Sequence, residues 1–168
     1  MCTSLPAMAN VADHHPSIKG FTLLPSLSNN INTTDSRKLW CSVDVCKTLK
    51  MEGVNIEGLS HVIKQQNIEC VLICNWRDQG WGNQKGTLYV RERGGIGSIN
   101  LELATWERLV SPAPHARQQL RVQIPPKFVK TEGFELGYSV GGGGGHELYV
   151  GSARVRFISK DEADEFLP

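Results

Sequence analysis

Side chains of several chemical kinds crowd one short segment that also carries three glycines. Its donors, acceptors and aromatic ring come from Arg77, Asp78, Gln79, Trp81, Asn83 and Lys85. In ligand sites an indole covers the apolar face of a small molecule, while amides and carboxylates bind its hydroxyl groups. The segment therefore indicates a site for a polar small molecule or a glycan. The competing interpretation is structural: the glycines form turns, and Trp81 tucks into the end of the protein.

The second candidate segment is the run Gly141 to Gly145, centred on Gly143 and followed by His146. A glycine costs roughly 0.5–1 kcal/mol relative to alanine in regular structure, so five in a row indicate a compensating reason. Close approach of a ligand is one reason, and consecutive amides of such a loop can also form an anion nest. An equal alternative is that Trp76 or Trp81 packs onto the bare backbone.

His146 is the histidine best suited to chemistry, since it follows the glycine run and can donate a hydrogen bond or act as a general base. In an enzyme, Asp78 would be its acid/base partner; a purely structural role for His146 is the competing interpretation. No nucleotide-binding P-loop and no G-x-S-x-G nucleophile motif occurs in the sequence. Linear spacing brings no metal ligands together, so we expect neither a metal nor a cofactor.

Both segments interrupt predicted strands. The run from Cys70 to Trp76 is almost continuously apolar, which is typical of a strand in the middle of a sheet with both faces covered. A strand over 87–93 follows it, so the first glycine segment connects two strands. The glycine run is predicted to be a hairpin loop between two further strands. The remaining strand-like segments are 18–24, Leu39–Val45, 99–104, Leu120–Ile124, 134–140 and 148–157.

About eight short strands separated by turn signals predict an all-β protein, an antiparallel β-sandwich that is jelly-roll-like. The 168 residues suit a single domain. Composition divides the chain into a mobile leader over 1–17, the sandwich domain over 18–159 and an acidic tail over 160–168.

The formal net charge of +1 excludes a strong field for nucleic acid or an anionic membrane, so neither is an expected partner. No apolar run has the length of a signal peptide or of a spanning helix, which predicts a cytoplasmic protein. The five cysteines are an odd number, which favours reduced thiols, although Cys70 and Cys74 would share one strand face. The sequence does not indicate an oligomeric state.

Four arginines, Arg91, Arg93, Arg154 and Arg156, alternate on predicted outward strand faces. Such arginines usually keep a surface soluble, and the alternative is a groove for an anionic ligand.

The segments 76–86 and 138–148 together resemble small β-sandwich domains that are similar to galactose-binding-like jelly rolls, over about residues 36 to 158. The resemblance implies loops gathered at one end of the sandwich. Such sandwiches include lectins, carbohydrate-binding modules, protein-interaction modules and some enzymes.

The leading functional hypothesis is binding of a small polar or glycan-like ligand at one end of the sandwich, without catalysis. One alternative is a small acid/base enzyme, a lyase, isomerase or cyclase, that uses His146 and Asp78. The other is an intracellular protein-interaction module in which the glycine loops are only structural.

Overall fold

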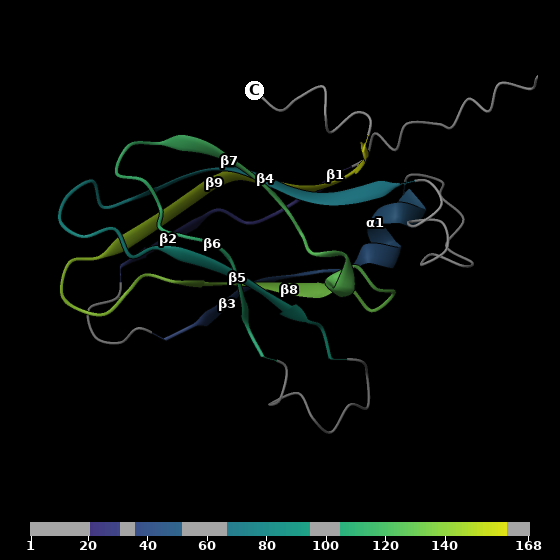
Figure 1. The fold of residues 1–168 in the computed structure, drawn as a ribbon, viewed down its shortest axis with the longest axis horizontal. Coiled ribbons are helices and arrows are strands. Elements are labelled where there is room, and N and C mark those ends of the chain that lie inside the picture. Colours follow the sequence, from purple (N-terminus) through teal and green to yellow (C-terminus); the bar gives the residue numbers. More distant parts are fainter. Residues whose placement is uncertain (1–20, 31–35, 52–66, 95–104, 161–168) are drawn as a thin grey trace, which may run out of the picture.

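The computed structural model describes residues 21–30, 36–51, 67–94 and 105–160, which form two antiparallel sheets packed face to face (Figure 1). Sheet A contains β1 (Phe21–Leu23), β2 (Leu27–Asn30), β9 (Glu147–Ser159), β4 (Ile68–Asp78) and β7 (Gln118–Gln123). Sheet B contains β3 (Lys38–Val43), β8 (Phe134–Ser139), β5 (Thr87–Glu92) and β6 (Glu107–Val110). The predicted antiparallel β-sandwich is confirmed.

The strands pair in a nested order along the chain. β1 and β2 both pair with β9, β3 pairs with β8, β4 with β7, and β5 with β6. Contacts of β4 with β9 and of β5 with β8 complete the two sheets. A long hairpin rolled into two layers produces this pattern, which is the winding of a jelly roll.

The core lies between the sheets and is made of alternate residues of the strands. Leu72 and Cys74 of β4 belong to this core, together with Phe134 and Leu136 of sheet B. Burial of each large apolar side chain stabilises the fold by roughly 1.5–3 kcal/mol. β4 lies between β9 and β7, as its apolar run predicts, but sheet B covers only one of its faces. On the other face a small cluster joins Val71, Ile158 and the half-buried Ile73.

The first strand of sheet B is shorter than its alternation predicts. β3 ends at Val43, and α1 (Val45–Met51) begins where the strand was expected to continue. Asp44 caps the helix: its Oδ1 accepts a hydrogen bond from the Lys47 amide at 2.8 Å. The alternation predicts Leu39 on the same inner face as Cys41 and Val43, but the register shifts after Leu39 and this side chain is 52% exposed.

The glycine run is not a hairpin loop, because β8 belongs to sheet B and β9 to sheet A. Residues 140–146 therefore cross from one sheet to the other. Residues 79–86 do the same between β4 and β5, and residues 111–117 do so between β6 and β7. All three crossings lie at the end of the sandwich opposite α1, on the left of Figure 1, which we call the loop end.

The predicted boundaries of the remaining strands and of the terminal segments can be compared with the described residues. β7 matches its prediction, and Pro125 ends that segment before the 3-10 helix η2 (Pro126–Phe128). β6 was not predicted. The predicted leader over 1–17, the predicted strand over 99–104 and all but the first residue of the predicted tail over 160–168 lie outside the described residues. In the described ranges, no helix has both the length and the apolar character needed to cross a membrane.

Candidate functional site

The two glycine segments meet at the loop end. The Trp81 ring lies so close to the backbone of Gly145 that a Cβ atom there would stand 2.8 Å from ring atom Cη2. Lys85 packs its stem against Gly141, and its ammonium donates a hydrogen bond to the Gly142 carbonyl at 2.7 Å. The glycines thus make room for side chains of the first segment, with Trp81 as the packing residue.

Gln79 ties the two segments together through its side-chain amide. The oxygen accepts a hydrogen bond from the Glu147 amide at 3.2 Å. The nitrogen donates to His146 Nδ1 at 3.2 Å and to the Trp81 carbonyl at 2.6 Å, with the Asn83 carbonyl also within 3.3 Å. Because these bonds occupy both ends of the amide, Gln79 holds the loops in place instead of facing a ligand.

His146 is oriented by this contact. Its Nδ1 must accept the hydrogen bond from Gln79, so in the neutral ring Nε2 carries the proton. Nε2 would lie 3.8 Å from a Cβ atom placed on Gly143, and the Lys85 ammonium would lie 3.9 Å from the same point. Two N–H donors from separate loops therefore border the space beside Gly143, where φ is +103°. His146 itself is only 8% exposed.

Asp78 pairs with a histidine, but with His115 and not with His146. The Asp78 side chain is completely buried, and its Oδ1 accepts hydrogen bonds from His115 Nδ1 and from the Gly80 amide, both at 2.8 Å. Its other oxygen, Oδ2, is buried without a partner among the described residues. The imidazole of His115 is 40% exposed. A carboxylate that binds Nδ1–H leaves Nε2 of the ring free to accept a proton.

Backbone hydrogen bonds join the third crossing to the first. The Asp78 amide donates to the Pro114 carbonyl, and the Ala113 amide donates to the Gly86 carbonyl, each at 2.8 Å. These bonds bring His115 beside Asp78. In the sequence His115 stands out only as a histidine that follows a proline-rich turn. Its place in that loop is the only sequence feature that could have indicated a role for it.

Trp81 provides the exposed apolar surface of the loop end. Its side chain is 60% exposed although one edge of the ring contacts Gly145. Asn83 and Lys85 are exposed in the same loop. The ring is therefore not buried in the end of the sandwich. One edge is held against Gly145, and the rest of the ring faces solvent.

Arg77 lies apart from the other residues predicted for this site. Its guanidinium stacks on the ring of Tyr149 at 4.1 Å from the ring centroid. Both side chains belong to the outer face of sheet A, where they line a cavity of about 240 Å³. The first segment therefore supplies residues to two different surfaces.

Of the four described cysteines, Cys70 and Cys74 are buried, and Cys41 and Cys46 are partly buried. Cys70 and Cys74 are free and point into the core. Burial raises the pKa of Cys74 to about 12 and that of Cys41 to about 12, and it raises the pKa of Cys70 further. These groups remain neutral at physiological pH, which removes thiolate chemistry. Among the described residues, no three His, Cys, Asp or Glu side chains gather closely enough to hold a metal ion.

No protein-family model, no curated protein and no solved structure matches this chain.

Proposed function

We propose that the loop end binds a small polar or glycan-like ligand without transforming it. The observation that carries the proposal is the exposed indole of Trp81, held on the glycine loop beside two convergent N–H donors, Lys85 Nζ and His146 Nε2. A ring that is already fixed loses little conformational entropy when a ligand stacks on it.

The chemistry of a sugar suits this arrangement. The apolar face of a pyranose would stack on Trp81, and its hydroxyl oxygens would accept hydrogen bonds from Lys85 and His146. Asn83, which is exposed in the same loop, supplies both a donor and an acceptor. The Gln79 amide bonds to His146, and the Asp78 carboxylate bonds to the Gly80 amide of the same loop as Trp81 and Asn83.

The net charge of +1 provides little long-range attraction for a polyanion. We therefore propose a small ligand for this site, and neither nucleic acid nor a membrane. Our proposal includes a resemblance to galactose-binding-like domains, which rests on the two glycine segments. The shared feature would be a binding site made by loops at one end of a jelly roll.

The test is a titration of the protein with a panel of monosaccharides and oligosaccharides, observed by NMR. Trp81→Ala is expected to weaken binding by about tenfold or more, since stacking and burial of the ring are lost. Leu39→Ala is the matched control, because Leu39 is also an exposed apolar side chain, 52% exposed, but lies on β3. Failure of every sugar to bind, or equal losses in both variants, would sink the proposal.

A second candidate is the acid/base enzyme, and one observation favours it: the 2.8 Å contact between the buried Asp78 carboxylate and the half-exposed His115. In this version His115, not His146, is the general base, and Asp78 fixes its tautomer. The test is turnover of whichever ligand binds. If the protein is an enzyme of this kind, His115→Ala should abolish turnover and leave ligand affinity unchanged. Turnover that persists in this variant would rule out His115 as the general base.

A further inference from the structure

The cavity of about 240 Å³ on the outer face of sheet A has a clear origin in the backbone. β9 gains one residue relative to β4, because Ile73 pairs with Arg154 while Asn75 pairs with Gly151. Within this bulge Ser152 adopts φ of +50°. A Cβ atom on Gly151 would meet no atom within 4 Å, so the glycine leaves the hollow open. Bulges of this kind commonly redirect side chains beside functional sites.

Two arginines line the cavity from neighbouring strands. Arg77 is the last outward residue of β4, and Arg117 immediately precedes β7. Arg77 is held in place: its ring partner Tyr149 lies at 4.1 Å, and one guanidinium nitrogen donates to the Asp78 carbonyl at 3.2 Å. A guanidinium has five N–H donors, so most of those on Arg77 stay available for a ligand.

Besides Trp76 and Gly151, the remaining residues that line the cavity carry polar groups. Ser26, Asn75 and Ser152 border the same cavity and carry hydroxyl or amide groups. Tyr149, which also lines the cavity, donates its hydroxyl to the Glu147 carboxylate. In the part of the chain that the structure describes, no carboxylate forms an ion pair with Arg77 or Arg117.

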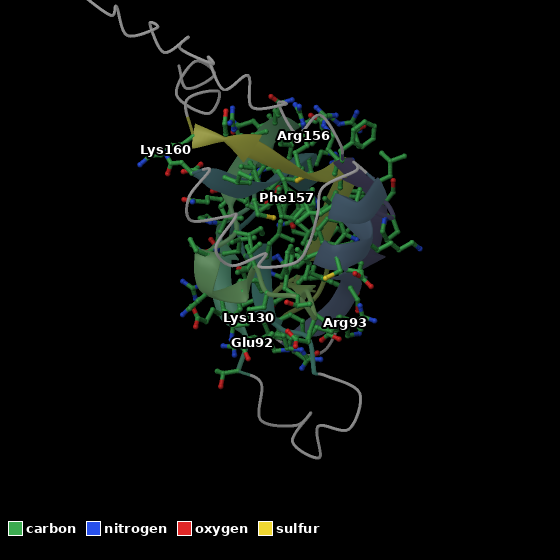
Figure 2. All side chains as sticks on the ribbon, turned by 90° about the vertical axis from the view of Figure 1, so that its right-hand side faces the viewer. Glu92, Arg93, Lys130, Arg156, Phe157 and Lys160 are labelled. Atoms are coloured by element: carbon green, nitrogen blue, oxygen red, sulfur yellow. The ribbon has the colours of Figure 1, made fainter. Side chains whose placement is uncertain are left out.

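The surrounding face of sheet A is positively charged. Ile73 points to this face, and its partners across both neighbouring strands are Arg121 and Arg154. Arg156 lies on the same face; Figure 2 shows it on the outer side of sheet A, while the adjacent Phe157 points between the sheets. In sheet B, Arg91 is paired with Glu135 at 2.6 Å. Among the described residues, no ion pair joins a carboxylate to Arg121, Arg154 or Arg156 of sheet A.

We propose that this cavity is a second site, which binds the phosphate group of a small molecule between Arg77 and Arg117. A phosphate monoester carries about −1.5 to −2 charges and three acceptor oxygens. Two guanidiniums match that charge, and the serine hydroxyls and the Asn75 amide supply further donors. The cavity lies just below the range of about 300–1,000 Å³ for drug-sized ligands, which suits a small anion.

The experiment is calorimetric titration of the full chain with inorganic phosphate and with pyrophosphate, at moderate salt. Arg117→Gln is expected to weaken binding by about tenfold or more, because a charge-assisted hydrogen bond is lost. Gly151→Leu should abolish binding by filling the hollow. This variant has no backbone strain to overcome, since Gly151 does not adopt a left-handed φ.

Arg154→Gln is the charge-matched control, because it removes one positive charge from the same face without lining the cavity. It should change phosphate affinity by less than about twofold at moderate salt, where exposed charges are screened. Equal losses in Arg154→Gln and Arg117→Gln would show diffuse attraction and overturn the site. A failure of the protein to bind phosphate would also overturn the site. The same holds if a single-stranded oligonucleotide binds instead and every outward arginine contributes equally to its affinity. Thermal unfolding of each variant verifies that it folds.

Discussion

The indole of Trp81 lies against the backbone of Gly145: a Cβ atom on that glycine would stand 2.8 Å from Cη2 and 3.1 Å from Cζ2 of the ring. The glycine also adopts φ of +79°, which side-chain-bearing residues rarely adopt. The position of the ring therefore depends on the absence of a side chain at residue 145.

Gly145→Ala should displace Trp81 and destabilise the protein by about 1–3 kcal/mol, through left-handed strain and the steric clash. Ligand affinity at the loop end should fall with it. Gly144→Ala is the matched control: a Cβ there meets nothing within 4 Å and no left-handed φ is needed. Urea unfolding of the control should agree with the wild type within about 0.5 kcal/mol. Equal stability of the two variants would contradict the packing role of Gly145.

Gln79→Ala should loosen both glycine segments at once, because one amide bonds to each of them. We expect a loss of about 1–3 kcal/mol, the cost of leaving partly buried partners unsatisfied. Amide hydrogen exchange should accelerate in 79–86 and in 140–146 together. Gln84→Ala, an exposed glutamine in the same loop, should change neither quantity. Faster exchange in only one of the two segments would show that Gln79 does not couple them.

His115→Ala should destabilise the fold by about 1.5–3 kcal/mol, because the buried Asp78 carboxylate loses a charge-assisted hydrogen bond and keeps only the Gly80 amide. His115→Asn should recover part of the loss, since its amide nitrogen can replace Nδ1–H. A double-mutant cycle with Asp78→Ala should give a coupling energy of about 0.5–3 kcal/mol. Simple additivity of the two changes would mean that the contact contributes nothing.

Stability should fall as the pH rises above about 9, because of the buried thiols. Burial raises the pKa of Cys74 from 9.0 to about 12, so between these values the folded state keeps its proton while the unfolded state loses it. The unfolded state then binds fewer protons, and each such thiol contributes a slope of up to about −1.4 kcal/mol per pH unit.

Urea unfolding at several pH values between 7 and 10.5 measures this slope. Below pH 8 the thiol contribution should be flat. Cys74→Ala should lower stability at every pH but give a shallower decline above pH 9, which separates titration from cavity formation. An unchanged slope in this variant would exclude Cys74 as a source of the pH dependence.

The parts of the fold that sequence patterns predicted are the local ones. Alternation located β7 and β8, and the apolar run identified β4 as a central strand. The assignment of strands to sheets is not local: β8 and β9 are neighbours in the chain but pair with strands far away, so a short glycine connection resembled a hairpin. The strand periodicity ran through Asp44, which instead caps α1.

The candidate site shows the same division. Trp81, Lys85 and His146 could be selected by residue type, and the structure brings them together. The partner of Asp78 could not be selected, because His115 reaches it through a third crossing whose position depends on the whole jelly roll. Arg77 was grouped with its sequence neighbours, although successive residues of a strand point to opposite faces.

The nested strand order has a consequence for synthesis of the chain. β9 lies inside sheet A, between β4 and the strands β1 and β2, yet it follows every other described strand along the chain. Until residues 147–159 emerge, one edge of β4 has no partner and its apolar residues lack part of their cover. Sheet A therefore closes only after residues 147–159 are synthesised, and until then the unpaired edge of β4 is open to pairing with another chain.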